Sequence, residues 1–151
     1  RGIVERDFPD DVVYNIGRAY GTILKENNQI NISVSGDIRF TTNKLKDSLT
    51  SGLLDVGINV YDMGVLPTPI NYFSLFHTDI KNSIQVTGSH NPKEYNGFKI
   101  SFNKKPFFGS DIQELYIGVV FSYISLYCLY RCYTVIHRYI QLYTVTIYHN
   151  L

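Results

Sequence analysis

Apolar side chains follow a helical spacing in two parts of the first half of the chain. One pattern starts after Asp10-Asp11 and stops at Asn27-Asn28. A carboxylate at either aspartate can cap this helix, because it accepts hydrogen bonds from unpaired backbone amides at the positive end of the helix dipole. The second pattern closes at Gly57, a usual residue type at a helix C-terminus. The two apolar faces consist of Ile16, Ala19, Tyr20, Ile23 and Leu24, and of Leu45, Leu49, Leu53 and Val56.

Four short segments have the pattern or composition of strands. Residues 30–35 alternate apolar and polar side chains, which is typical of a strand. The other three are residues 58–63, 82–87 and 97–102. A short apolar helix begins at residues 66–69, where proline is tolerated in the first turn. Because strands alternate with helices, the sequence predicts right-handed crossovers and a mostly parallel sheet in an α/β fold.

Two polar loops follow predicted strands. Residues 35–43 carry Asp37 and Arg39, and residues 87–96 carry most of the remaining polar chemistry. Ligands of open α/β sheets bind beyond the carboxyl ends of the strands. We therefore expect these two loops to form the ligand site.

Composition excludes several classes of partner. The formal net charge is +1, from 14 basic and 13 acidic residues, which gives no electrostatic footprint for nucleic acid or an anionic membrane. An anion must therefore be bound by a local site. Two cysteines are too few for a disulfide framework, and no secretory signal is visible at the start of the sequence. The expected location is the cytoplasm, without nucleic-acid or membrane partners.

The second loop opens the run TGSHNPKEYNGFKI at residues 87–100. Gly88 lets the backbone turn where a side chain would clash, and Asn91 is biased towards an extended conformation because Pro92 follows it. The loop is therefore expected to hold Ser89 out at the end of a strand.

Three reaction classes use an exposed loop of this kind. A serine hydrolase needs a base bonded to the hydroxyl, but His90 is the next residue, neighbours in an extended segment point apart, and no G-x-S-x-G elbow is present. A nucleotide-binding loop needs a glycine-rich motif that is not in the sequence. Phosphoryl transfer through the serine needs nearby donors and cations, which His90, Lys93 and Lys99 supply. The alternative is a plain turn, which requires neither His nor Lys.

The run TGSHNP at residues 87–92 resembles the active-site serine loop T-[AG]-S-H-N-P of the α-D-phosphohexomutases, the phosphomannomutase/phosphoglucomutase family. With YNGFKI at residues 95–100, it is most similar to the branch that acts on both phosphomannose and phosphoglucose. Three further segments match in order. They are Arg1-Gly2, similar to the end of D-I-R-G; Asp37 and Arg39 in a G-x-D-x-R loop, with Ser35 in place of the usual glycine; and GVLPTP at residues 64–69, similar to G-x-x-P-T-P.

The resemblance implies that residues 1–115 are the first of four phosphohexomutase domains, with a mixed, mostly parallel sheet sandwiched by helices. Ser89 would be the phosphoserine that donates its phosphoryl group to a hexose monophosphate and recovers one from the bisphosphate intermediate. The implied reaction is an isomerase reaction of carbohydrate metabolism. The implied activator is glucose or mannose 1,6-bisphosphate, and the phosphate on Ser89 would be one ligand of Mg²⁺.

The resemblance also implies roles for the residues around Ser89. Lys99 and Arg1 would stabilise charge or act as acid/base groups, and His90 would support the phosphate or a proton transfer. A hydrogen-bonded structural histidine is the alternative for His90. The implied substrate-binding residues are Asp37, Arg39, Asn91 and Lys93.

Other family motifs do not occur in the 151 residues. They are the D-G-D-x-D-R loop that supplies the remaining Mg²⁺ ligands, the sugar-recognition loop and the phosphate-anchoring loop. We therefore expect this chain alone to be inactive, or nearly so, as a mutase. The competing interpretation is a non-catalytic relic or a sugar-phosphate-binding module.

Residues 116–151 differ in composition from the rest of the chain. They contain no Lys, Asp, Glu or Pro and hold most of the 13 tyrosines. Just before them, a capping box at residues 110–113 predicts the start of a helix. Such a run has high strand propensity and almost none of the charged residues that protect apolar strands from aggregation. We interpret it as an irregular tail in which the coding sequence leaves the family frame, by truncation, frameshift or intron read-through.

Three alternatives for this tail remain open. A membrane segment is disfavoured because the uncharged run ends at Arg131, before the roughly 20 residues that a spanning helix needs. A self-associating segment is the second alternative. A zinc site is the third, and it is disfavoured because its candidate ligands lack the tight pair spacing of known fingers. These ligands are Cys128, Cys132, His137 and His149.

Overall fold

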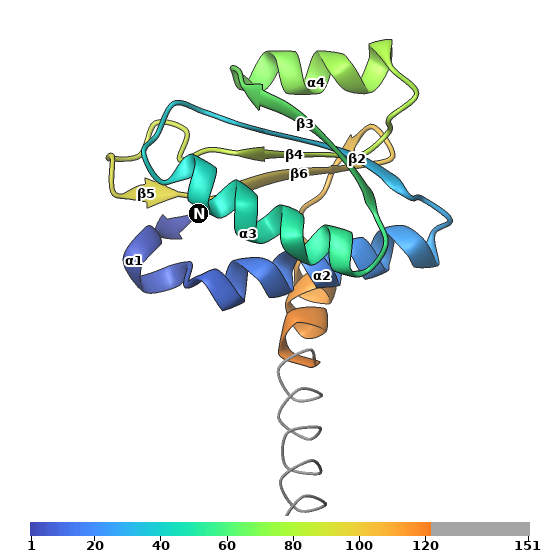
Figure 1. Cartoon of the computed structure of the whole chain (residues 1–151), viewed down its shortest axis with the longest axis horizontal. Coiled ribbons are helices and arrows are strands. Elements are labelled where there is room, and N and C mark those ends of the chain that lie inside the picture. The colour runs from blue at the N-terminus through green and yellow to red at the C-terminus, as the bar shows by residue number, and fades with distance from the viewer. Residues whose placement is uncertain (122–151) are drawn as a thin grey trace, which may run out of the picture. The chain divides into compact units, whose positions relative to one another are not determined.

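The computed structural model describes residues 1–121, which contain a five-stranded mixed sheet (Figure 1). Three neighbouring strands are parallel, and the last two continue the sheet in antiparallel pairs. In their spatial order, the strands are β3 (Asn59–Val65), β2 (Asn31–Gly36), β4 (Ser83–Val86), β6 (Phe98–Phe102) and β7 (Lys105–Pro106).

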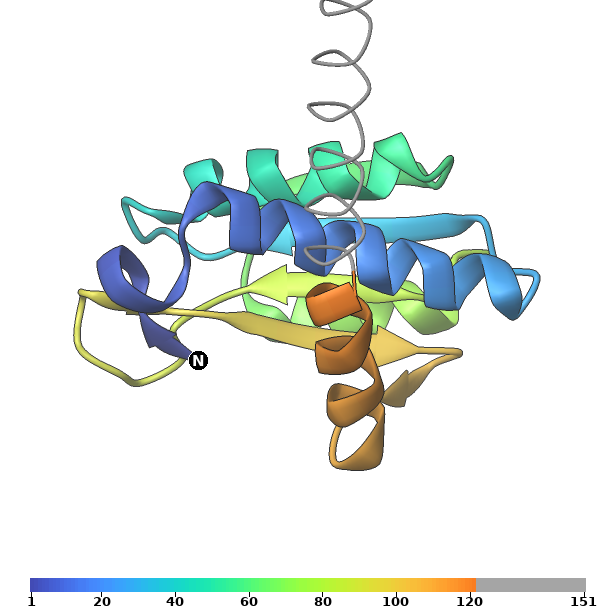
Figure 2. The same ribbon diagram turned by 90° about the horizontal axis from the view of Figure 1, so that it is seen from below.

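Helices cover both faces of this sheet. The helices of the described part are α1 (Val4–Asp7), α2 (Asp10–Glu26), α3 (Thr42–Asp55) and α4 (Thr68–His77), and residues 110–121 are also helical. Figures 1 and 2 show α4 on one face and the pair α2 and α3 on the other. The predicted fold class, a mixed sheet between helices, is confirmed.

A second, two-stranded sheet ties the start of the chain to the loop after β4. It consists of β1 (Gly2–Ile3) and β5 (Tyr95–Asn96), which run antiparallel with Gly2 opposite Asn96. The Val4 N–H adds a hydrogen bond of 3.0 Å to the carbonyl of Glu94. The sequence pattern did not predict this small sheet, because strands of two residues have no periodicity to detect.

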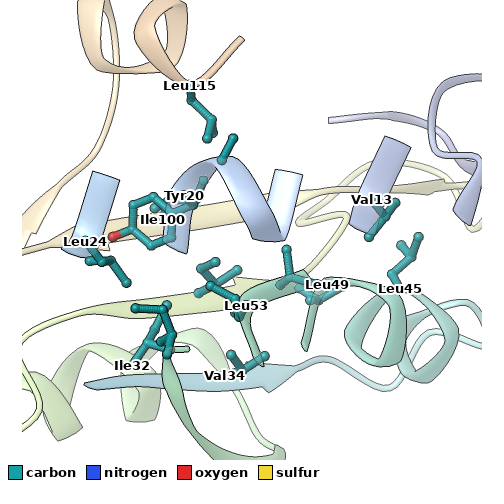
Figure 3. Packing of buried hydrophobic residues seen from close by; sticks show 14 of the residues in the cluster. Val13, Tyr20, Leu24, Ile32, Val34, Leu45, Leu49, Leu53, Ile100 and Leu115 are labelled. Atoms are coloured by element: carbon teal, nitrogen blue, oxygen red, sulfur yellow. The ribbon is translucent and has the colours of Figure 1, made fainter. Parts of the chain in front are cut away.

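The hydrophobic core lies between the sheet and the α2 and α3 layer (Figure 3). Both predicted helical faces point into it. Ile16, Ile23 and Val56 are partly buried there, and the other members of those faces are almost fully buried. The labelled core residues are Val13, Tyr20 and Leu24 from α2, Leu45, Leu49 and Leu53 from α3, Ile32 and Val34 from β2, Ile100 from β6, and Leu115.

One local prediction differs from the structure. Asp10 and Asp11 are not the cap of α2, because Pro9 occupies that position and the two aspartates lie in the first turn, where their charges still suit the helix dipole. The strand predicted at residues 30–35 is confirmed as β2, and its polar side chains Ser33 and Ser35 are buried. They are buried because α4 covers the sheet face opposite the core.

The capping-box prediction of a helix after residue 110 is confirmed over residues 110–121. Leu115 is buried, and Val119 packs against the core of the first compact unit, Arg1–Val119. A second unit covers Val120–Leu151, so the predicted boundary after residue 115 stays a prediction. The interpretations of the tail concern residues 122–151, which lie outside the described residues. No helix within the described part is both long and apolar enough to span a membrane.

Glycines allow α2 and α3 to touch along their backbones. A Cβ added to Gly52 of α3 would overlap the carbonyl oxygen of Tyr14 in α2, and one added to Gly17 of α2 would overlap the carbonyl oxygen of Leu49. Backbone atoms cannot move aside as a flexible side chain can. The spacing of these two helices over the sheet therefore depends on having glycine, without a side chain, at positions 17 and 52.

We expect Gly52→Ala to lower the free energy of unfolding by about 1–3 kcal/mol, because the added methyl group must push α2 and α3 apart. This cost exceeds the gain in helix propensity of about 1 kcal/mol. Urea unfolding followed by circular dichroism measures the change. Ser51→Ala, at an exposed neighbouring position of the same helix, is the control and should stay within about 0.5 kcal/mol of wild type. A Gly52→Ala variant as stable as wild type would contradict the backbone contact.

Candidate active site

The two predicted ligand loops lie side by side at one edge of the sheet. We name residues 37–41, after β2, the aspartate loop, and residues 87–97, after β4, the serine loop. Because β2 and β4 are parallel neighbours, both loops leave the sheet at its carboxyl edge. The Asp37 N–H donates to the carbonyl of Val86 at 3.0 Å, which joins the loops where they begin.

Ser89 has an unusual backbone conformation. Its φ is +57°, in the left-handed region. This conformation is energetically unfavourable for an L-residue that has a side chain. Its N–H donates to Thr87 Oγ1 at 2.9 Å, and its Oγ lies 3.3 Å from His90 Nδ1. The expectation that Ser89 and His90 point apart is therefore wrong, because the segment is a tight turn and not an extended chain. Within residues 1–121 no further hydrogen bond orients the His90 ring, as a hydrolase triad would require.

Asp37 links both loops through its carboxylate. Its Oδ1 accepts hydrogen bonds from Thr42 Oγ1 at 2.8 Å and the Arg39 N–H at 3.1 Å. Its Oδ2 accepts from Thr87 Oγ1 at 2.8 Å and Arg39 Nε at 3.3 Å. Burial acts to raise the pKa of Asp37, but these hydrogen bonds and the Arg39 charge outweigh it and hold the pKa below its ordinary value. The ionised Asp37 carboxylate thus holds the Thr87 hydroxyl in place, and that hydroxyl in turn accepts a hydrogen bond from the Ser89 N–H.

The Arg39 guanidinium binds the serine loop. Its side chain is only 15% exposed. Its Nη1 donates to the carbonyls of Pro92 at 2.6 Å and Tyr95 at 2.9 Å. Its Nη2 donates to the carbonyls of Asn91 at 2.7 Å and Ser89 at 3.0 Å. One side chain of the aspartate loop therefore contacts four carbonyls of the serine loop.

Ser89 lies between two pockets. The first, the Lys99 pocket, contains Ser89, His90 and Lys99, and the second, the Lys93 pocket, contains Ser89, Asn91 and Lys93. The structure thus brings most of the predicted site residues to the serine. Asp37 lines both pockets, and Arg39 lines the Lys93 pocket.

Arg1 lies next to Gly97, at the far end of the serine loop from Ser89. It is the neighbour of β1 and packs against Gly97, where an added Cβ would come within 2.8 Å of the Arg1 Cα. Gly97 accepts a hydrogen bond from the Thr87 N–H at 2.8 Å. Arg1 therefore supports the base of the serine loop, and it does not line the pockets that contain Ser89.

The wall of the Lys99 pocket opposite Ser89 was not predicted. It is formed by the first turns of α4, with Thr68 and Tyr72 among its residues. The sequence contained a usable signal, because α4 follows β3, and β3 is parallel to β2 and ends at the same edge of the sheet. Thr87 was also missed as a link between Asp37 and Ser89, since hydroxyl bonding cannot be read from a motif.

Buried hydrogen bonds attach α4 to the sheet beneath this wall. Asn71 of α4 donates from Nδ2 to Ser35 Oγ of β2 at 2.6 Å and accepts from Ser83 Oγ of β4 at 2.8 Å. Gln85 of β4 donates from Nε2 to the carbonyl of Leu66, just before α4, at 3.0 Å. Because these bonds are directional and the two made by Asn71 are buried, they fix α4 relative to the strands that carry the two loops.

The comparisons with known proteins agree on one family. The family model described as "Phosphoglucomutase/phosphomannomutase, alpha/beta/alpha domain I" matches residues 1–116. A phosphomannomutase of Vibrio cholerae is 43% identical over 102 residues, which cover 66% of this chain and 22% of that protein. A phosphomannomutase of Klebsiella pneumoniae is 42% identical over 120 residues, covering 76% of this chain and 74% of that protein.

A solved structure agrees with the sequence comparisons. The crystal structure of a phosphoglucomutase/phosphomannomutase family protein from Burkholderia thailandensis matches with a TM-score of 0.75 and 34% identity. The match covers 80% of this chain and 28% of that one. This chain thus spans roughly a quarter of the length of two of these three relatives, for which the matched shares are 22% and 28%.

We expect Asp37→Asn to lower the free energy of unfolding at pH 7 by about 1–3 kcal/mol, because an amide nitrogen replaces an oxygen that accepts hydrogen bonds. The native pKa of Asp37 is lowered, so its ionised form contributes stability above the unfolded pKa of about 3.9. That contribution is lost as the pH falls through the lower native pKa. The difference between wild type and variant should therefore shrink in acid.

Urea unfolding at a series of pH values measures this difference. Asp47→Asn, at an exposed position of α3, is the matched control and should have little effect at any pH. A difference between wild type and Asp37→Asn that is the same at neutral and acid pH would contradict a role for the charge.

Proposed function

The chain belongs to the phosphoglucomutase/phosphomannomutase family through its first α/β/α domain, and on that premise we propose that Ser89 carries the phosphoryl group in a phosphohexomutase reaction. The observation that carries the proposal is the position of Ser89 in a tight turn between two pockets, each with a lysine. Phosphoryl transfer depends mainly on positioning and on charge stabilisation, and this arrangement suits both needs.

In the proposed step, Ser89 Oγ attacks a phosphorus atom of a hexose 1,6-bisphosphate. The Oγ–P bond forms as the bond from phosphorus to the sugar oxygen breaks, and that oxygen takes up a proton. The serine proton passes to a base, and the distance of 3.3 Å from Ser89 Oγ supports His90 Nδ1 as its acceptor. In the complementary step, the free hydroxyl of a hexose monophosphate attacks the phosphorus atom of the phosphoserine. The Oγ–P bond breaks as the bond from phosphorus to the sugar oxygen forms, and the proton of that hydroxyl returns to Ser89 Oγ through the base.

The charged residues of the two pockets have separate roles in this proposal. Lys99 stabilises negative charge on the phosphoryl group, supported by its place with Ser89 and His90 in the Lys99 pocket. Asn91 and Lys93 bind the substrate, supported by their place in the Lys93 pocket. Arg1 acts on the serine loop through Gly97, since the contacts of Arg1 lie there.

The described residues do not by themselves fit a magnesium site. Within residues 1–121 no group of three or more His, Cys, Asp or Glu side chains could hold a metal ion. The Asp37 oxygens already accept four hydrogen bonds. Within the described part of the chain, the proposed contribution to a Mg²⁺ site is therefore the phosphate on Ser89, as one ligand.

The same proposal includes the hexose bisphosphate as activator and the cytoplasm as the location. The activator follows from the family reaction, which uses a bisphosphate intermediate. The location is supported by the scarcity of cysteine, which is consistent with a reducing compartment. The competing function is a sugar-phosphate-binding module without turnover. Phosphate transfer to Ser89 distinguishes the two.

We expect the purified chain, incubated with glucose 1,6-bisphosphate and Mg²⁺, to acquire one phosphate on Ser89, because Ser89 is the reacting hydroxyl. Mass spectrometry of peptides that span the serine loop measures the site and the stoichiometry. Ser89→Ala should acquire none there, and Ser51→Ala, an exposed serine of α3, should match wild type. A wild-type chain that binds the bisphosphate and stays unphosphorylated would favour the binding module.

We expect the chain alone to show little or no conversion of glucose 1-phosphate, because the implied Mg²⁺ and sugar-binding loops do not occur in it. A coupled assay for glucose 6-phosphate measures this conversion. A chimera supplies the contrast, with residues 1–116 replacing the matching segment of the Vibrio cholerae phosphomannomutase. The chimera should be active and its Ser89→Ala version inactive. An inactive but folded chimera would contradict a catalytic role for this domain.

A further inference from the structure

We propose that Arg39 is a positioning residue, which holds the serine loop in the conformation that presents Ser89 and does not bind the sugar phosphate. The inference rests on the proposed function, because it takes Ser89 as the phosphoryl acceptor. It changes the role that the sequence resemblance implied for Arg39, which was substrate binding.

The hydrogen bonds of Arg39 use every donor that it has. A guanidinium carries five N–H groups, one on Nε and two on each terminal nitrogen. Nε donates to Asp37, Nη1 donates to two carbonyls of the serine loop, and Nη2 donates to two others. No N–H is left for a phosphate oxygen. A substrate could bind Arg39 only by displacing the backbone of the loop that carries the nucleophile.

Binding the carbonyls also orients the amides of the loop. In a planar trans peptide the C=O and the following N–H point in opposite directions. The carbonyls of Ser89 and Pro92 point to Arg39, so the N–H groups of His90 and Lys93 point away from it. A phosphate would be repelled by the carbonyl oxygens and attracted by the amides. Arg39 therefore holds these repelling carbonyl oxygens on one side of the loop and leaves the N–H groups of His90 and Lys93 on the other.

The unfavourable φ of Ser89 needs such an outside constraint. A non-glycine residue in the left-handed region persists where surrounding contacts determine its conformation. Two contacts do this at Ser89, since its N–H is bound by Thr87 and its carbonyl by Arg39. Gly88 is part of the same arrangement, because an added Cβ there would collide with the Arg39 guanidinium.

Lysine cannot replace Arg39 in this role. A lysine has the same charge but only three N–H donors on a single nitrogen, whereas the four carbonyls need a planar group with two separate ends. A residue that simply attracted phosphate would be replaced in part by lysine. The conservative substitution therefore separates positioning from substrate binding.

The first experiment measures hydrogen exchange of the full chain by mass spectrometry, in peptides that cover the serine loop. We expect Arg39→Ala and Arg39→Lys each to exchange these amides about tenfold faster than wild type, because several charged hydrogen bonds are lost. Guanidinium ion at a sub-denaturing concentration should restore protection in Arg39→Ala. Arg18→Ala is the control, since Arg18 pairs with Asp55 away from the loop, and it should match wild type.

The second experiment measures the rate at which glucose 1,6-bisphosphate phosphorylates Ser89 in the same proteins. We expect Ser89 to be phosphorylated about tenfold or more slowly in both Arg39 variants. Guanidinium ion should restore the rate of Arg39→Ala, whereas the lysine of Arg39→Lys should not restore it. Wild-type loop protection in Arg39→Lys would overturn the inference. A lysine variant that is phosphorylated at the wild-type rate would overturn it as well.

The two readouts separate failure of the inference from failure of the proposed function. If wild type is never phosphorylated, the proposed function fails, while loop protection still decides the role of Arg39. If neither variant folds, NMR of the wild-type guanidinium decides it. Slowly exchanging Nη–H signals with hindered rotation would support the bound guanidinium, and freely rotating, rapidly exchanging ones would overturn it.

Discussion

The hydrogen bond between the Asp37 carboxylate and Thr87 joins two loops that are far apart in the sequence. Asp37 follows β2 and Thr87 follows β4, and the parallel pairing of these strands brings the two residues together. Thr87 uses its hydroxyl a second time to receive the Ser89 N–H. The position of Ser89 is therefore determined by the end of a neighbouring strand as well as by its own loop.

The opposite wall of the site depends on a different kind of contact. On this face of the sheet the polar side chains of Ser35, Ser83 and Gln85 are buried. Asn71 of α4 is hydrogen-bonded to Ser35 and Ser83, and Gln85 donates to the carbonyl of Leu66 just before α4. Apolar contacts would allow α4 to slide, whereas buried hydrogen bonds specify one position. The sheet is thus apolar where it supports α2 and α3 and polar where it supports the pocket wall.

Sequence reasoning succeeded where the information is local. Periodicity identified the long helices, which the structure confirms, and the motif at residues 87–92 identified the family, which the comparisons confirm. It failed where the answer depends on tertiary contacts. An alternating pattern could not show that Ser33 and Ser35 face a covering helix, and an extended loop was assumed where Ser89 has a φ of +57°. The hydrogen bonds that occupy Arg39 join residues about 50 positions apart, beyond the reach of a motif.

That separation along the chain has a consequence for the order of folding. The loop that presents Ser89 is completed only after β2 and β4 have paired and the start of the chain has docked on β5, and all of these contacts are non-local. Such contacts form late, because loop-closure entropy must be overcome first. During synthesis and in partly folded states Ser89 is thus an ordinary flexible serine, and the phosphoryl chemistry proposed for it requires the finished domain.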